Sequence, residues 1–325
     1  MIGLELAPEH PVSDLVEYGV AAERGGFDTL FLSHHYNNRD QFAALAAIAG
    51  ATDEIDLGPG VANPYETHPA TLASRMATID EYADGRGVFG VGPGDAQTLS
   101  NLGIDRDRPL RRVLETFRVA RDLWTGERVT HDGTFTVEGA RLNYAPGEIP
   151  VYVGAQGPHM TRMAAKHADG VLFNGAHPRD YEWASERVAE GLADRPEESD
   201  EFDFAAYAPV SVARDGEAAR AEARYPVAFV VGSAADPLLA RHDIDREAAA
   251  AVGEAVAAGE FSTAAERVTD RMLSAFAIAG TPDEVEKQVD AVLEYADSFV
   301  AASPLGPDLA EAIPLTGAVL SRSRY

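Results

Sequence analysis

The sequence has no cysteine among its 325 residues. Disulfide bonds, thiolate metal ligands and a cysteine nucleophile are therefore excluded, and any catalysis must use other side chains. The sequence also lacks any apolar stretch near the roughly 20 residues that span a bilayer. Because residues 1–8 run directly into sequence typical of a folded core, we expect no membrane segment and a cytoplasmic location.

Lysine is almost absent: Lys166 and Lys287 are the only two, so nearly all positive charge is arginine. The formal net charge is −26, although 46% of the residues are hydrophobic, which favours a folded chain with an acidic surface over an acidic disordered one. Such a surface indicates a halophilic protein, since molar salt screens charges over about 3 Å; the alternative is an acidic mesophilic protein. The surface also repels phosphate backbones, so we expect no nucleic-acid partner.

Eight short apolar runs, each followed by a Gly, Pro or Asn break and a segment of helical period, predict eight β-strands. Their continuous hydrophobicity is typical of parallel strands buried on both faces. The runs are Ile2–Ala7, Thr29–Ser33, Asp56–Val61, Gly87–Val91, Val151–Ala155, Gly170–Asn174, Ala205–Val212 and Ser298–Ser303. Eight strand and helix repeats favour an α/β fold of the (β/α)₈ or TIM-barrel type over an open doubly wound sheet, as one domain over residues 1–325.

The expected helices carry signals of their own. Residues 281–284, Thr-Pro-Asp-Glu, supply an N-cap, a first-turn proline and a capping-box acid. Pro69 suits the first turn of another helix. Its buried stripe consists of Leu72, Met76, Ile79 and Ala83.

Two stretches break the alternation of strands and helices. Residues 126–150 hold an Asp132–Gly133 turn between two runs of strand-forming residues, which predicts a hairpin inserted after the fourth helix. Residues 214–279 are too long for one crossover and predict a helical insertion before the last strand. Insertions on the carboxyl side of the strands often help to build the substrate pocket, and an oligomer interface is the alternative for the second one.

Polar residues at the carboxyl ends of the strands are the candidates for chemistry, because barrel enzymes place their reactive groups there. Glu5 lies near the end of the first strand between two leucines. Burial raises the pKa of a carboxyl toward neutrality, which a general acid requires; the alternative is a structural salt bridge to an arginine. Asp95 follows the fourth strand and is a second candidate, or else a helix cap.

A glycine-rich loop between the fifth strand and a helix that begins at Pro158 offers free backbone amides, which suit a phosphate. The end of the sixth strand is expected to close around the same anion, although a turn of this kind is often no more than a tight turn. The residues concerned are Gly154, Ala155, Gln156, Gly157, Asn174, Gly175 and Ala176.

Two further kinds of site are disfavoured. His34 and His35 have no third ligand with metal-binding spacing on the same element, so we expect no metal. The first strand-to-helix turn lacks a Gly-x-Gly-x-x-Gly run, which disfavours a Rossmann dinucleotide site.

Several sequence runs occur in a distinctive order along the chain. They are Gly3–Glu5, His35–Asn38, Leu57–Tyr65 with His68 and Pro69, Gly92–Asp95, Gly154–Pro158, Ala240–Asp245 and Ser303–Asp308. These runs resemble those of the methylenetetrahydromethanopterin reductases, which belong to the bacterial luciferase-like barrel family. The similarity covers essentially the full chain, and it is specific for the reductases, because the central loop runs and the Ser-Pro-x-Gly-Pro run are not general barrel features.

The resemblance implies that the barrel binds coenzyme F420, a deazaflavin. The family holds this ring against a bulge after the third strand that contains a non-prolyl cis peptide, here Gly60–Val61. It also implies that residues 154–157 and 174–176 bind the cofactor phosphate. The other residues implied to contact the cofactor are His34, His35, Asn63 and Thr98.

The implied reaction, which acts on a CH–NH group in one-carbon metabolism, moves a hydride from the reduced deazaflavin to the methylene carbon that bridges N5 and N10 of a tetrahydropterin. Ring opening needs a proton donor, a role that the resemblance gives to Glu5, with Asp95 also near the pterin. His34 stands where the methanogen enzymes carry Asp, which leaves open the polarisation of the deazaflavin ring and the cofactor identity. A halophilic source that makes no methane leaves open whether the carrier is methanopterin or folate. The alternatives are an FMN-dependent monooxygenase and a non-catalytic flavin-binding barrel. Related barrels form homodimers or homotetramers.

Overall fold

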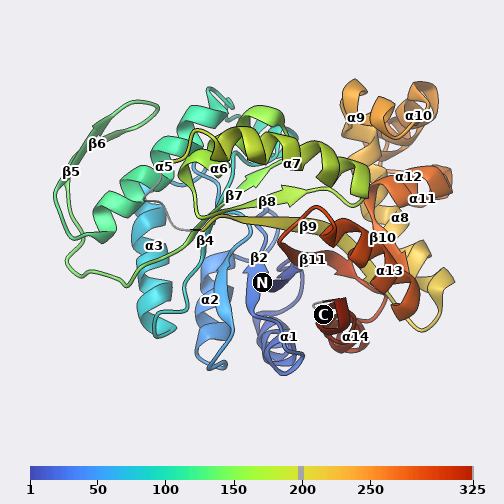
Figure 1. Ribbon diagram of the computed structural model, residues 1–325, viewed down its shortest axis with the longest axis horizontal. Helices are drawn as coiled ribbons and strands as arrows, with labels where there is room; N and C mark the ends of the chain where they lie inside the picture. Colours follow the sequence, from blue (N-terminus) through green and yellow to red (C-terminus); the bar gives the residue numbers. More distant parts are fainter. Residues whose placement is uncertain (197–200, 324–325) are drawn as a thin grey trace.

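Eight parallel strands form a barrel surrounded by helices in the computed structural model, which describes residues 1–196 and 201–323 (Figure 1). The strands pair in the order β3-β2-β1-β11-β9-β8-β7-β4. Two isolated parallel bridges, Leu57 to Gly87 and Ala62 to Val91, join β3 to β4 and close the ring. The barrel strands are β1 (Ile2–Leu6), β2 (Thr29–Leu32), β3 (Asp56–Pro59), β4 (Phe89–Val91), β7 (Val151–Ala155), β8 (Gly170–Asn174), β9 (Asp203–Val212) and β11 (Ser298–Leu305).

These are the eight strands that the apolar runs predict, and the (β/α)₈ class is confirmed. One strand was missed: β10 (Ile278–Gly280) pairs in parallel with the end of β9. Its three residues are too few to show a periodic pattern. Gly60 and Val61, which the third run included, lie beyond the end of β3.

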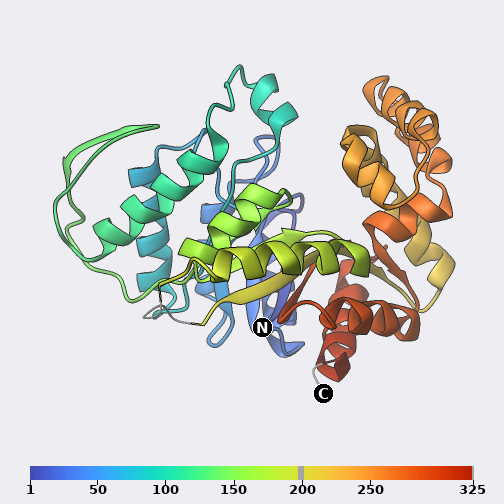
Figure 2. The same ribbon diagram turned by 45° about the horizontal axis from the view of Figure 1, so that its top comes forward.

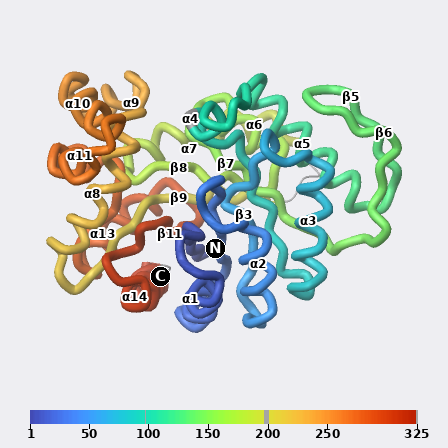
Figure 3. Tube along the Cα trace, turned by 180° about the vertical axis from the view of Figure 1, so that it is seen from behind, coloured from blue at the N-terminus to red at the C-terminus, as the bar shows by residue number. Residues whose placement is uncertain are grey.

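Helices cover the outside of the barrel, and α14 packs beside α1 to complete the ring (Figure 3). The predicted stripe of α3 is buried, with Leu72, Met76 and Ile79 at most 3% exposed. The capping box between Thr281 and Glu284 is present at the start of α13. The surrounding helices are α1 (Val12–Arg24), α2 (Gln41–Ala49), α3 (Pro69–Tyr82), α5 (Pro109–Trp124), α6 (Pro158–His167), α7 (Pro178–Leu192), α13 (Pro282–Leu293) and α14 (Leu309–Ser323).

A repeated aspartate contact fixes the amino ends of the strands. Asp28, Asp169 and Asp297 each directly precede a strand, and each accepts a hydrogen bond from a backbone amide near the start of the neighbouring strand, at 2.7, 2.7 and 2.9 Å. Hydrogen bonds from backbone amides to a carboxylate are among the stronger ones in proteins. The amino end of the barrel is thus built for stability, which leaves the carboxyl end for chemistry.

An antiparallel hairpin of β5 (Val129–Asp132) and β6 (Thr136–Ala140) projects from the barrel beyond α5 and α3 (Figure 2). The buried Glu115 on α5 anchors it, because its Oε2 accepts hydrogen bonds from the backbone amide and hydroxyl of Thr134, both at 2.7 Å. Burial alone raises the pKa of Glu115, but these bonds and those from Arg111 and His131 outweigh it and lower the pKa to about 2.

Replacing Glu115 by Gln is expected to destabilise the hairpin anchor by about 2 kcal/mol, because charge-assisted hydrogen bonds are lost. The folded pKa is depressed, so in the wild type this stabilisation is present above pH 4.5 and is lost as the pH falls toward 2. Urea unfolding monitored at several pH values measures both effects. The difference between wild type and Glu115→Gln should shrink as the pH falls from 6 to 3; a constant difference would contradict the assignment.

A group of helices forms the other projection, on the side of the barrel opposite the hairpin (Figure 2). These helices have their own apolar cluster, which includes Val231, Val252 and Met272. The cluster continues to Phe276, at the end of α12 (Asp270–Phe276), and to Ala279 in β10. The helices are α8 (Gly216–Ser233), α9 (Asp236–Arg241), α10 (Arg246–Ala257), α11 (Phe261–Arg267) and α12 (Asp270–Phe276). In the described ranges, no helix is both long enough and apolar enough to cross a membrane.

Candidate active site

Glu5 lies inside the barrel near its carboxyl end, with its side chain almost fully buried. Its neighbours Leu4 and Leu6 face the helices, because side chains alternate along a strand. The Glu5 Oε2 accepts a hydrogen bond of 2.8 Å from the backbone amide of Ser303 on β11. Within the described chain, the hydrogen-bond partners of Glu5 are Ser33 and Ser303, not an arginine.

Burial raises the pKa of Glu5, and the hydrogen bonds from Ser33 and Ser303 only partly oppose this effect. The nearby charge of Glu9 raises the pKa further. A carboxyl with a raised pKa can hold a proton near neutral pH and deliver it to a substrate. Of the two carboxylates that the sequence singles out, Glu5 has the environment of a general acid.

Tyr207 on β9 is a site residue that sequence reasoning missed. Its hydroxyl donates a hydrogen bond of 3.2 Å to the carbonyl oxygen of Gly60. Burial, followed by the charge of Glu5, raises the pKa of Tyr207, so the two side chains lie in the same interior space. In the sequence, a single tyrosine in the run Ala-Ala-Tyr-Ala-Pro looks like an ordinary buried aromatic.

The loop after β3 forms a bulge, and the peptide bond between Gly60 and Val61 is cis. The Val61 side chain lies between two glycines, Gly92 directly after β4 and Gly154 in β7. A Cβ atom on Gly92 would be 2.5 Å from Val61 Cγ2, and one on Gly154 would be 3.1 Å from Val61 Cγ1. Only residues without a side chain allow the bulge to occupy this position, so the three residues form a shallow cradle at the barrel mouth.

A first polar network joins the loops after β2 and β3. Glu66 accepts a hydrogen bond of 2.8 Å from Asn63 Nδ2, and it lies 3.1 Å from His34 Nε2. Asn63 in turn accepts a hydrogen bond of 2.9 Å from the backbone amide of Tyr65. Of these residues, sequence reasoning found His34 and Asn63 but missed Glu66, because nothing in its local pattern distinguishes it from a surface acid.

Arg112 on α5 holds the same loop from outside. Its guanidinium donates to the carbonyl oxygen of Pro64 at 3.0 and 2.8 Å, and to that of Thr134 at 2.7 Å. The guanidinium also lies 4.7 Å from the centre of the Tyr65 ring, within the range of a cation–π interaction. The position of Asn63 and Glu66 is thus fixed by the barrel and by α5.

A second polar network contains His35, Thr98 and Asp95. The Thr98 hydroxyl lies 3.1 Å from His35 Nε2 and 3.0 Å from Asp95 Oδ1. Asp95 Oδ1 also accepts a hydrogen bond of 2.7 Å from the Thr98 amide, so Asp95 is the N-cap of α4 (Ala96–Asn101). Asp95 is exposed, whereas Glu5 is buried.

The loop from Gly154 to Gly157 leads from β7 into α6 at the same end of the barrel. Gln156 and Gly157 are exposed, and a Cβ atom on Gly157 would meet no atom within 4 Å. No side chain caps the amino end of α6, so its first amides can bind an anion. The exposed Asn174 ends the neighbouring strand β8, which brings the two predicted anion-binding segments together.

The sequence matches the luciferase-like monooxygenase family over residues 2–301. The chain belongs to this family. It is 41% identical to the 5,10-methylenetetrahydromethanopterin reductase of Archaeoglobus fulgidus over 97% of both chains, and 39% identical to that of Methanolobus tindarius over 97% of this chain and 98% of the relative. The solved structure of the coenzyme F420-dependent tetrahydromethanopterin reductase from Methanopyrus kandleri superimposes with a TM-score of 0.93, at 34% identity, over 99% of this chain and 98% of that one.

The described part of this luciferase-like barrel contains no set of side chains suited to bind a metal ion. No group of three His, Asp or Glu side chains there is arranged to hold a metal ion. The two histidines that follow β2 have other partners, since His34 contacts Glu66 and His35 contacts Thr98.

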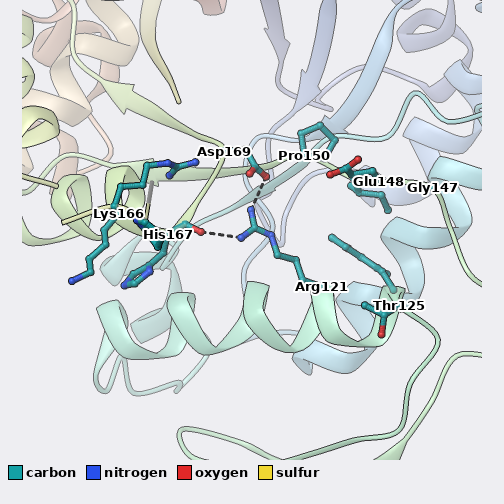
Figure 4. A pocket seen from close by; sticks show the side chains of 12 residues that line it. Arg121, Thr125, Gly147, Glu148, Pro150, Lys166, His167 and Asp169 are labelled. Atoms are coloured by element: carbon teal, nitrogen blue, oxygen red, sulfur yellow. Dashed lines mark hydrogen bonds and ion pairs between the residues drawn. The ribbon is translucent and has the colours of Figure 1, made fainter. Parts of the chain in front are cut away.

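A hollow of about 670 Å³ lies at the end of the luciferase-like barrel opposite the mouth, near the amino ends of β7 and β8 (Figure 4). Arg121 crosses it and donates to the carbonyl oxygen of His167 at 2.9 Å and to Asp169 at 2.7 Å. Arg195 donates to the carbonyl oxygens of Ala165 and Ala168. These cations stabilise the carboxyl end of α6. The hollow therefore has a structural explanation, and the candidate active site is the mouth that holds Glu5.

Proposed function

We propose that this protein transfers a hydride from reduced coenzyme F420 to a 5,10-methylene-tetrahydropterin, giving the 5-methyl form. The observation that carries the proposal is Glu5, a buried carboxyl with a raised pKa at the mouth of a luciferase-like barrel. The match to named reductases over almost the whole chain supports the same reaction.

The residues at the mouth fit a deazaflavin cofactor. Val61, supported by Gly92 and Gly154, offers an apolar surface for a flat ring, and the uncapped start of α6 offers amides to its phosphate. When bound, the reduced cofactor supplies the hydride. The other proposed cofactor contacts are His34, His35, Asn63, Thr98, Ala155, Gln156, Gly157, Asn174, Gly175 and Ala176.

Glu5 supplies the proton in this proposal. Reduction of the methylene bridge opens a five-membered ring, and the departing nitrogen needs a proton. The buried Glu5 carboxyl holds that proton and, in the wall of the barrel, stays out of bulk water. Asp95 Oδ1 is engaged in capping α4, so we assign Asp95 to the pterin side of the mouth without a proton-transfer step.

An assay with reduced F420 tests the proposed reaction. The purified protein, in molar KCl to screen its net charge of −26, should reoxidise reduced F420 when methylenetetrahydromethanopterin or methylenetetrahydrofolate is added. Each pterin is tested separately, because the halophilic character of the acidic surface leaves the carrier open. Reoxidation by neither pterin would overturn the proposal. Binding of FMN with oxygen consumption would favour the monooxygenase alternative instead.

The proposal includes a cytoplasmic homodimer or homotetramer. With a net charge of −26, like charges on two copies repel each other, so association should increase with salt. Sedimentation between 0.1 and 2 M KCl measures this dependence.

A further inference from the structure

A buried ion cluster joins the helical projection to the barrel just beyond the loop that follows β8. Its centre is Asp180 in the first turn of α7, whose carboxylate is 3% exposed. Asp180 accepts a hydrogen bond of 2.7 Å from Arg241 Nη1, and both of its carboxylate oxygens lie 3.0 Å from His242 Nε2. Arg241 ends α9 and His242 follows it. The contact therefore links two segments about sixty residues apart.

Aromatic rings pack against both partners of Asp180. The guanidinium of Arg241 lies 4.3 Å from the centre of the Trp183 ring. The ring of His242, which is 5% exposed, packs between His177 and Phe276, with centroid distances of 5.3 and 5.7 Å. Removing either partner of such a buried pair leaves the other without compensation, so the first turn of α7 is held in one position.

The next residue along the chain carries this restraint to the β8 loop. Tyr181, fully buried beside Asp180, donates a hydrogen bond of 2.6 Å to the carbonyl oxygen of Gly175. The amide of Gly175 donates to the carbonyl oxygen of Tyr207 at 3.3 Å, and Tyr207 in turn donates to Gly60 in the bulge. A continuous chain of contacts thus leads from α9 through α7 to both parts of the proposed cofactor site.

We propose that Asp180 and His242 are positioning residues for the cofactor-binding loop 174–176. They touch no reacting atom; they fix α7, and through Tyr181 they fix the Gly175 backbone that faces the cofactor phosphate. This inference rests on the proposed function only because it takes the bound cofactor to be F420. It also gives the helical projection a function: Arg241 at the end of α9 and His242, the next residue, hold the loop through Asp180.

The test compares Asp180→Asn and His242→Leu with a matched control. Asp80→Asn is that control, because Asp80 is a carboxylate 1% exposed that accepts two backbone hydrogen bonds, from Gly87 at 3.1 Å and Gly147 at 3.0 Å. It lies next to the residues that precede β4, at the amino end of the barrel. Asp80→Asn therefore makes the same chemical change as Asp180→Asn, but in a buried structural carboxylate that lies away from the proposed cofactor site.

Each variant is characterised by its F420 binding and turnover and by the amide exchange of its Gly175 segment. We expect the Kd for oxidised F420, from its fluorescence, to rise about tenfold in Asp180→Asn and His242→Leu, while kcat at saturating F420 stays within about twofold. Amide exchange of the Gly175 segment, measured without cofactor, should become faster in both. His242→Gln keeps a donor near the Nε2 position and should restore both values to within about threefold of wild type. Asp80→Asn should change neither.

The outcomes separate the two proposals. The positioning role is wrong if a folded Asp180→Asn or His242→Leu protein keeps both the wild-type Kd for F420 and the wild-type amide exchange of the Gly175 segment. Equal changes in Asp80→Asn overturn it as well, since the effect is then one of general stability. If Asp180→Asn does not fold, the comparison of His242→Leu with His242→Gln decides. If the wild type does not bind F420, the proposed function fails, and the exchange measurement still tests the link between α9 and the loop.

Discussion

Replacing Glu5 by Gln should lower kcat by roughly 10²- to 10⁴-fold, which is the usual contribution of a positioned general acid. Glutamine has nearly the same shape and can accept the hydrogen bond from the Ser303 amide, but its amide is far too weak an acid to protonate the departing nitrogen. Because Glu5 is not assigned to the cofactor phosphate or the ring cradle, the Kd for F420 should change little. Steady-state kinetics with reduced F420 and F420 titrations measure the two quantities separately.

The pH profile gives a second readout of the same residue. The folded pKa of Glu5 is raised, and the protonated form is the active one, so kcat should be constant at low pH and fall as the pH rises through the raised value. The free energy of unfolding should also decrease as the pH rises. The penalty for burying the charged carboxylate is absent below pH 4.5 and grows as the pH rises toward the folded pKa. Glu5→Gln should remove both dependences.

Glu9→Gln is the matched control for this experiment. Glu9 is exposed, lies in the loop after β1 and acts on Glu5 only through its charge. Its replacement should leave kcat near the wild-type value and shift the fall of the pH profile to slightly lower pH. If Glu5→Gln retains most of the wild-type kcat, or if Glu9→Gln loses as much as Glu5→Gln, the general-acid role of Glu5 is wrong.

The strands of the barrel were predictable because each is a run buried on both faces, a pattern that depends on local residues only. The strand β10 was not, because its three residues Ile278–Gly280 pair with β9 from within a helical segment. Glu5 was predictable for the related reason that a carboxylate inside an apolar run is unusual in itself. Its burial and its raised pKa agree with that expectation.

The other parts of the site depend on contacts between distant segments. Tyr207 acts through Gly60, which is 147 residues away, and Ser303 through Glu5, 298 residues away. No local pattern marks Tyr207, and the Ser-Pro-x-Gly-Pro run that begins at Ser303 does not reveal that the Ser303 amide bonds to Glu5. Asp95 shows the opposite problem, since its position after the fourth strand fits both a catalytic acid and a helix cap, and the structure shows that it caps α4.

The Gly92→Ala variant should weaken F420 binding roughly ten- to hundredfold, as overpacking in a closed site costs about 1–3 kcal/mol. The added Cβ would lie 2.5 Å from Val61 Cγ2. Val61 is β-branched, so its side chain has few rotamers with which to avoid the contact. The bulge must therefore move out of the cradle, and the proposed ring-binding surface moves with it.

Gly147→Ala provides the comparison, because its Cβ would be 3.5 Å from Asp80 Oδ2, an ordinary contact at the other end of the barrel. It should bind F420 as the wild type does. In Gly92→Ala, the loss should appear in the Kd for F420 while the protein stays folded, because the strain falls on a loop at the mouth and the barrel strands keep their pairing. Unchanged F420 binding by folded Gly92→Ala would show that Val61 does not support the cofactor ring.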